Sequence, residues 1–434
     1  MFLVVAACSS DGGSNTDGGV TPDSGSGSDS SGVDVTQPAD HDLGDGSLGT
    51  CLGAQLLSAL GKTHLLAGAS MADATAKSTP FELRYTYLSG GLFDGTSPCA
   101  SCASGCTAKG ISCKNGTQPG CGWWGCWQYD QDPPGAYVRS FATTANGDNQ
   151  IPMITYYEIL HTSGVAEGAP EVTQAATNVS VMTRYFADWR FLLQQIGNGV
   201  AFLHIEPDFW GYAQQTGKDA HALTAAVASA NATDCASQEN SIAGLGRCLV
   251  SMVRKYAPNA RVGLHASAWS TNYDDSGNTN ASYDIAGDAK KTAAFLVACG
   301  ADISDFIVVE ASDRDAGYYQ SQNKNTWWDD TNAKLPDFHQ DFAWLTALAE
   351  AANMPLVDWQ LPVGNMSLPN TTNQWKDNRV DYFFSHTQEL AATHMVAFAF
   401  GAGAGGQTTP ETDNGNLVSK VKAYATAGGQ KLCP

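Results

Sequence analysis

Residues 201–210 read AFLHIEPDFW, an apolar run that ends in two carboxylates separated by one proline. The run is short and contains no turn residue before Pro207, which is typical of a buried strand. A strand that is apolar along its whole length belongs to a parallel sheet covered on both faces. The stretch therefore predicts a strand inside an α/β protein, with Glu206 and Asp208 at its carboxyl end.

Similar runs recur along the chain, at residues 64–67, 81–88, 152–160, 201–207, 261–269, 305–312, 355–363 and 395–401. Longer amphipathic stretches lie between most of them, at residues 172–196, 243–256, 286–299, 338–352, 379–393 and 416–427. Alternating strands and helices predict a parallel sheet with helices outside, and eight such units predict an α/β fold of the (β/α)8 TIM-barrel type. The first run is the least strand-like, and seven strands without it would suit an open or distorted barrel.

Half of the 12 cysteines lie within residues 99–126, in a loop insertion at about 95–130 that follows the second predicted strand. No His lies in this segment, so we favour three local disulfides over a zinc site, with a pairing that the sequence does not determine. The other cysteines of the folded part are expected to form two pairs and one free buried thiol: Cys235 with Cys248, Cys51 with Cys433, and Cys299 alone.

Residues 1–8 read MFLVVAAC, which resembles the lipobox of bacterial lipoproteins. The resemblance implies a signal remnant and a lipid anchor on Cys8, with the protein at the cell surface, on a bacterial outer membrane. Residues 9–47 are rich in Ser, Gly and Asp and have too few large apolar side chains to fold, so we expect a disordered tether. The barrel domain would then span residues 48–434.

Overall charge excludes other classes of protein. The chain has 43 Asp and Glu against 23 Lys and Arg, a formal net charge of −20, which repels nucleic-acid phosphates. The sequence contains no run of ~18 or more apolar residues, so no membrane-spanning helix is predicted. The sequence also lacks a G-x-S-x-G elbow and a G-x-G-x-x-G turn in the right setting, which disfavours an α/β-hydrolase and a dinucleotide-binding protein.

In a barrel of this type the functional residues lie at the carboxyl ends of the strands. Several predicted strands end in carboxylates with aromatic residues beside them. Carboxylates supply the acid, base or nucleophile of glycosidic cleavage, and aromatic rings stack on sugars. The candidate catalytic residues are Glu206, Asp208 and Glu310. The candidate substrate-binding residues are Tyr87, Tyr156, Glu158, His204, Trp210, His265, Trp269, Asp313, Trp359, Gln360 and Asn365. We therefore predict a monomeric glycoside hydrolase that acts on an extracellular polysaccharide or oligosaccharide, neutral rather than anionic.

Residues 201–212 (AFLHIEPDFWGY) resemble the I-E-P-D strand of the glycoside hydrolase family 6 cellulases. Residues 247–250 and 259–266 resemble that family's Cys-bearing helix and the strand after it. The resemblance implies that Asp208 is the general acid of an inverting hydrolysis. The family's second Asp, on a D-x-P-D-R-D strand, has no match at residues 156–160, and its G-E-x-D-G loop corresponds at best to residues 411–415. The whole chain also resembles secreted, glycoside-hydrolase-like bacterial barrel proteins.

A retaining mechanism is the competing interpretation. Many retaining barrel glycosidases carry the acid/base at the end of strand four, where Glu206 stands, and the nucleophile after strand seven. Here strand seven offers Asp358 and Gln360 but no Glu, so Glu310 is the alternative partner. The carboxyl separation distinguishes the two mechanisms, because ~5–5.5 Å implies retention and ~6.5–9.5 Å implies inversion.

Other interpretations of the same residues remain open. His204, His265 and Glu206 would form a metal site only if the strand stays regular through Glu206, and we expect no metal and no cofactor. The glycine-rich residues 401–406 suit a tight loop better than a phosphate site, since no Lys or Arg lies near them. The rival functions are a non-catalytic carbohydrate-binding barrel and a surface protein whose Cys-rich loop contacts a partner.

Overall fold

The computed structural model describes residues 51–89, 135–160, 168 and 171–432. The predicted lipid anchor, the tether, the Cys-rich insertion and Cys433 all lie outside these residues. Within the described ranges, no helix has the length and apolar character needed to cross a membrane.

Eight parallel strands form a closed barrel in chain order. They are β1 (Leu66–Ala69), β2 (Leu83–Ser89), β3 (Ile151–Tyr157), β4 (Phe202–Ile205), β5 (Arg261–His265), β6 (Phe306–Val309), β7 (Leu356–Leu361) and β8 (Met395–Phe400). The first run does form a strand, and β1 pairs with both β2 and β8. The prediction of a (β/α)8 barrel is thereby confirmed, and the seven-stranded alternative is wrong.

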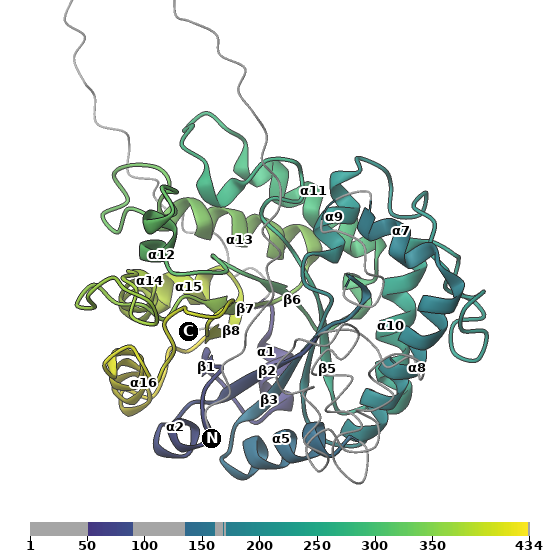
Figure 1. The fold of residues 1–434 in the computed structure, drawn as a ribbon, viewed down its shortest axis with the longest axis horizontal. Helices are drawn as coiled ribbons and strands as arrows, with labels where there is room; N and C mark the ends of the chain where they lie inside the picture. The colour runs from purple at the N-terminus through teal and green to yellow at the C-terminus, as the bar shows by residue number, and fades with distance from the viewer. Residues whose placement is uncertain (1–50, 90–134, 161–167, 169–170, 433–434) are drawn as a thin grey trace, which may run out of the picture.

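Helices surround the strands (Figure 1). They are α1 (Ala54–Ala59), α2 (Asp73–Ser78), α5 (Ala136–Gly147), α7 (Glu171–Thr177), α8 (Val179–Ile196), α9 (Phe209–Gln215), α10 (Ile242–Tyr256), α11 (Ile285–Ala298), α12 (Ala316–Ser321), α13 (Phe338–Ala352), α14 (Arg379–Ser385), α15 (Thr387–Ala392) and α16 (Asn416–Thr426), with 3-10 turns η2 (Asp275–Gly277) and η3 (Ala301–Ile303).

Two of the predicted helices are each divided in the structure. The stretch 172–196 breaks at Asn178, whose side chain caps α8 by accepting a hydrogen bond from the Val181 amide at 3.2 Å. A side chain that satisfies a free amide at a helix start favours a new helix over continuation of the old one. The stretch 379–393 likewise divides into α14 and α15 around His386.

The amino-terminal end of the barrel is filled with apolar side chains. Leu66, Phe202 and Phe306, near the starts of their strands, belong to one buried cluster, which also contains Leu56 and Leu57 of α1. Helix α1 therefore closes this end of the barrel. The polar residues that follow the strands gather at the opposite end, which is the functional face of such a barrel.

The structure confirms part of the predicted cysteine pattern. Cys235 and Cys248 form a disulfide that ties the loop before α10 to that helix, and Cys299 is a free buried thiol immediately after α11. A side chain at Gly246 of α10 would lie 2.1 Å from the Cys299 carbonyl oxygen. Helix α10 thus needs a glycine where it approaches the end of α11.

Candidate active site

Two carboxylates and one imidazole converge at the carboxyl end of the barrel. Asp208 follows β4, His265 ends β5 and Glu310 follows β6, so three consecutive strands supply them. One ligand atom from each of the three side chains lies within 4.8 Å of the other two. His265 is buried, while Asp208 and Glu310 are half-buried. The structure therefore brings together two of the three predicted catalytic acids.

Glu206 points away from this group. Regular alternation along β4 would place Glu206 on the same face as His204. Its φ of 50° instead puts the backbone in the left-handed region, and Asp208 follows with a φ of 65°. These two unusual residues end the strand and turn only the second acid toward the barrel mouth. A metal site made of His204, His265 and Glu206 would have required a regular strand through Glu206, and this backbone angle excludes it.

The Glu206 carboxyl group is built into the outer wall of the barrel. It accepts hydrogen bonds from the amide of Glu158 at 3.0 Å and from the amide of Ile159 at 3.3 Å, just after β3. Burial raises its pKa to about 8, even though these hydrogen bonds act in the opposite direction. We infer that Glu206 stabilises the end of β3 and does not contact a substrate at the mouth.

The environment of Glu310 favours its protonated form. Burial raises the pKa of this carboxyl well above its usual range, and the nearby charges of Asp208, Asp313, Asp358 and Asp274 add to the shift. Asp208 differs, because its Oδ2 accepts a hydrogen bond from the Tyr157 hydroxyl at 3.1 Å. A hydrogen bond to a carboxylate stabilises the charged form. The two acids thus occupy different environments at one site.

A chain of buried side chains leads to the third member of the group. Thr155 Oγ1 lies 3.2 Å from His204 Nδ1, and His204 Nε2 lies 3.1 Å from His265 Nδ1. Burial lowers the pKa of His265 to about 3 and that of His204 well below its usual value, with a further contribution from His265. Both imidazoles are therefore neutral at neutral pH. His265 Nε2 has no hydrogen-bond partner among the described residues.

Aromatic side chains form the floor of the mouth. The Trp359 ring of β7 lies 4.6 Å from the His204 ring, 5.8 Å from the His265 ring and 5.4 Å from the half-buried Tyr87 ring. Trp359 itself is only 2% exposed. Trp359 therefore packs against both histidines, whereas the Tyr87 side chain is partly exposed.

Three further predicted residues lie around the mouth, Trp269 and Asp313 in loops and Gln360 near the end of β7. Trp269 is half-buried and packs against Tyr212 with ring centroids 4.8 Å apart. Asp313 is half-buried and forms an ion pair with Arg314 at 3.3 Å. Gln360 is buried and donates from Nε2 to the Asp313 carbonyl oxygen at 3.5 Å. The negative charge of Asp313 contributes to the raised pKa of Glu310.

The predicted substrate-binding residues Tyr156, Glu158, Trp210 and Asn365 do not face the mouth. Tyr156 donates a hydrogen bond to Asp188 of α8 at 2.8 Å. The nearby charge of Glu158 contributes to the raised pKa of the same tyrosine. Trp210 is buried, with its indole donating to the Ile205 carbonyl oxygen at 3.0 Å. Asn365 is buried and donates to the Asp413 carbonyl oxygen at 2.7 Å. These four side chains hold the wall and the loops, which corrects the sequence-based set.

Tyr157 and Asp274 contribute to the site but were not selected from the sequence. Alternation along β3 places Tyr157 on the face of Thr155, which contacts His204, and Tyr156 on the other face. If the sequence had shown which residues of β3 pair with β4, Tyr157 would have been preferred to Tyr156 as a site residue. Asp274 follows β5 by nine positions, and no sequence signal relates it to Glu310.

The glycine-rich residues after β8 make a tight loop. A side chain at Gly401 would lie 2.0 Å from the Tyr85 hydroxyl oxygen, and one at Gly403 would lie 2.0 Å from the Asp313 carbonyl oxygen. The neighbouring loops are joined through Asp315, which accepts from the amides of Gly364 at 2.9 Å and Thr408 at 2.8 Å. Close packing of backbone accounts for the glycines without a phosphate.

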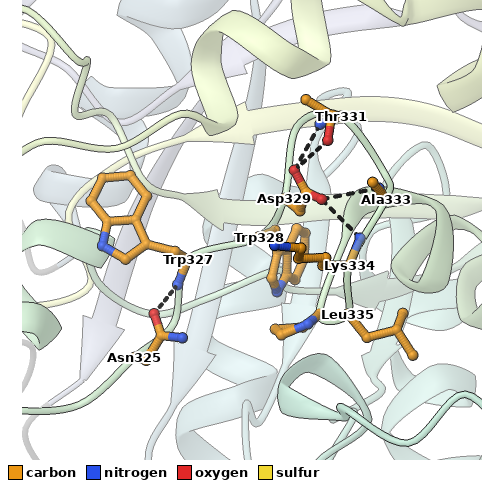
Figure 2. Close-up of a pocket in the computed structure, with 9 residues that line it drawn as sticks. Asn325, Trp327, Trp328, Asp329, Thr331, Ala333, Lys334 and Leu335 are labelled. Atoms are coloured by element: carbon orange, nitrogen blue, oxygen red, sulfur yellow. Dashed lines mark hydrogen bonds between the residues drawn. The ribbon is translucent and has the colours of Figure 1, made fainter. Parts of the chain in front are cut away.

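A hollow of about 340 Å³ lies apart from this site, in the loop before α13 (Figure 2). Asp329 accepts hydrogen bonds from the amides of Thr331, Ala333 and Lys334, which fixes the loop. Trp327 stands to one side of the hollow in Figure 2, and Trp328 is buried. The hollow does not contain the paired carboxylates, so we place the candidate active site at the barrel mouth.

No family model and no curated protein matches the sequence. Solved structures that resemble this chain include an endoglucanase from Mycobacterium tuberculosis, at 15% identity and a TM-score of 0.27, which matches over 52% of this chain and 56% of the endoglucanase. Another is a family 26 endo-β-1,4-mannanase from Cellulomonas fimi, at 11% identity and a TM-score of 0.48 over 87% of this chain and 74% of the mannanase. A third is a family 5 mannosidase from Rhizomucor miehei, at 10% identity and a TM-score of 0.42 over 84% of this chain and 92% of the mannosidase.

Proposed function

We propose that the protein is a glycoside hydrolase in which Asp208 and Glu310 cleave the glycosidic bond. The observation that carries the proposal is the approach of their carboxyl groups, within 4.8 Å at the open end of the barrel. A pair of carboxyl groups that flank one bond is what glycosidic cleavage requires. The two residues follow β4 and β6, so the barrel wall sets the spacing of their side chains.

The spacing favours retention of configuration over the inversion that the family 6 resemblance implied. It is close to the ~5–5.5 Å of retaining enzymes, and an inverting pair needs room for a water molecule. The Asp208 carboxylate would attack the anomeric carbon while Glu310 gives its proton to the departing sugar oxygen. Water, losing a proton to the Glu310 carboxylate, would then attack the same carbon and release Asp208.

The charge distribution favours a neutral polysaccharide or oligosaccharide. The carboxylates of Asp274 and Asp313 lie near enough to the catalytic pair to influence Glu310, and the formal net charge of the whole chain is −20. Anionic sugars would be repelled from such a mouth. Tyr87 and Trp269, both half-buried, are the aromatic side chains best placed to stack on sugar rings.

The experiment measures reducing-end release from neutral glucans, mannans and xylans and from anionic polysaccharides. The full chain, produced under oxidising conditions, is compared with Glu310→Gln and Asp208→Asn, and with Glu206→Gln as a matched control acid. We expect each variant of the pair to lose activity by a factor of about 10²–10⁴, while Glu206→Gln stays active. Binding to a glycan without product, unaffected in both variants, would instead indicate a non-catalytic carbohydrate-binding barrel.

We further propose that the protein is tethered to an outer membrane through Cys8. The proposal is supported by the lipobox-like residues 1–8 and by the polar composition of residues 9–47. Incorporation of labelled fatty acid into the wild type and its absence from Cys8→Ala would support the anchor. Equal labelling of both proteins would exclude it.

A further inference from the structure

We propose that Asp208, His265 and Glu310 form a binding site for a divalent transition-metal ion such as Zn²⁺, and that the bound ion inhibits the enzyme. The metal site stands on geometry alone, whereas inhibition rests on the proposed function. The three ligand atoms lie within 4.8 Å of one another. An ion bound at ~2.1 Å from each ligand spans separations up to about 4 Å, so a small movement of the half-buried carboxylates would close the site.

The histidine supplies independent support for this site. His265 is buried, one of its ring nitrogens lies within 4.8 Å of both carboxyl groups, and its Nε2 atom has no hydrogen-bond partner in the described part of the chain. A buried ring nitrogen without a partner is costly, and a metal ion would satisfy it. An acidic cluster alone would not provide such a fixed, neutral nitrogen ligand.

The buried chain behind His265 matches the environment of a metal-binding histidine. Such a histidine usually donates its other ring N–H to a neighbouring acceptor, which fixes the tautomer and the ring. Here His265 Nδ1 can donate to His204 Nε2 over 3.1 Å, and His204 Nδ1 to Thr155 Oγ1 over 3.2 Å. This direction of the chain leaves the lone pair of His265 Nε2 available for an ion that Asp208 and Glu310 also bind.

The donor set selects the kind of ion. One imidazole and two carboxylates suit Zn²⁺, which accepts nitrogen and oxygen ligands and, in open sites, three protein ligands with a free position. Mg²⁺ and Ca²⁺ prefer oxygen ligands only. The two carboxylates also offset the charge of a divalent ion. Because the ion would occupy the oxygens that attack the sugar and transfer the proton, it would compete with the substrate.

Other histidines of the chain provide a control. His221 pairs with Glu239 on the surface, so it offers one imidazole and one carboxylate at an exposed position. Isothermal titration calorimetry of the tag-free full chain with ZnCl₂ at neutral pH should give one site. We expect His265→Gln to lose it, Thr155→Val to weaken it by about 10–100-fold, and His221→Gln to retain it. MgCl₂ should give no comparable heat.

The outcomes separate the two proposals. No Zn²⁺ binding, or equal binding to wild type and to folded His265→Gln and Thr155→Val, overturns the metal site and leaves the glycosidase intact. If hydrolysis is found, Zn²⁺ should raise the KM for substrate without changing kcat, and a chelator should reverse the effect. A requirement for Zn²⁺ would overturn the inhibitory role. Absence of any hydrolysis would count against the proposed function, while calorimetry would still decide the site.

Discussion

The carboxyl groups of Glu206 and Asp208, two positions apart in the chain, lie on opposite sides of the barrel wall. Glu206 accepts backbone hydrogen bonds after β3 in the outer layer, whereas Asp208 lies at the mouth with His265. The positive φ angles of the two residues, 50° and 65°, make this separation possible. One acid is thus structural and the other is available for chemistry.

The first prediction concerns the structural acid. Replacing Glu206 by Leu removes the acceptor for the amides of Glu158 and Ile159, which are buried. Two buried donors without partners should lower the free energy of unfolding by about 2–4 kcal/mol, as measured by urea denaturation. Glu206→Gln is the matched control, because the amide oxygen still accepts and the pKa of Glu206, raised to about 8, keeps the native group largely protonated at neutral pH. Equal stability of Glu206→Leu and wild type would contradict this role.

Much of the fold was predictable because buried parallel strands are apolar along their whole length, and all eight runs are strands. The break at Asn178 was not, since helical periodicity continues across a residue whose capping role depends on the amide of Val181. The site, like the fold, was predictable only in part. Carboxylates after strands revealed Asp208 and Glu310, but no rule of alternation extends beyond the end of a strand. The outward direction of Glu206 therefore required backbone angles that only the structure supplies.

A second prediction compares two adjacent tyrosines. Tyr157→Phe removes the hydrogen bond to Asp208, and losing a hydrogen bond to a charged group should reduce kcat by about 10–100-fold. Tyr156→Phe removes an equivalent hydroxyl on the other face, where it donates to Asp188. That variant should lose stability and keep its kcat. Kinetics and thermal unfolding of both variants provide the comparison. Similar losses of kcat in the two variants would contradict a specific role of the Tyr157 hydroxyl at the mouth.

The third prediction concerns stability and pH. Burial raises the pKa of Asp341 and of Asp275 from 3.8 to about 7, and that of Asp315 likewise. An acid whose folded pKa is raised contributes stability that is fully present below its unfolded pKa and is lost as pH rises through the folded value. These three acids should therefore lower the Tm as pH rises from about 4 to about 8, by roughly 2 °C for each kcal/mol lost.

The histidines limit this effect on the acidic side. The lowered pKa values of His204 and His265 mean that their neutral forms stabilise the fold, and this stability is lost as pH falls below about 6.5. Relative to wild type, Asp341→Asn should gain Tm as pH rises from about 4 to about 8, because its side chain no longer ionises. A Tm difference between Asp341→Asn and wild type that stays constant over this range would contradict the assignment.

The last prediction is the stereochemical course. Carboxyl groups that approach within 4.8 Å favour a covalent intermediate on Asp208, so the first sugar released should keep the anomeric configuration of the substrate. Proton NMR of the products before mutarotation measures this. Glu310→Ala should still cleave an aryl glycoside with a good leaving group, and azide should restore its turnover by attacking the intermediate, giving a glycosyl azide of retained configuration. Azide acting on Asp208→Ala should instead give the inverted product, since it takes the place of the missing carboxylate. An inverted sugar from the wild type would mean that Asp208 is instead the general acid of an inverting hydrolysis, as the family 6 resemblance implied, and that the carboxyl groups move apart when the substrate binds.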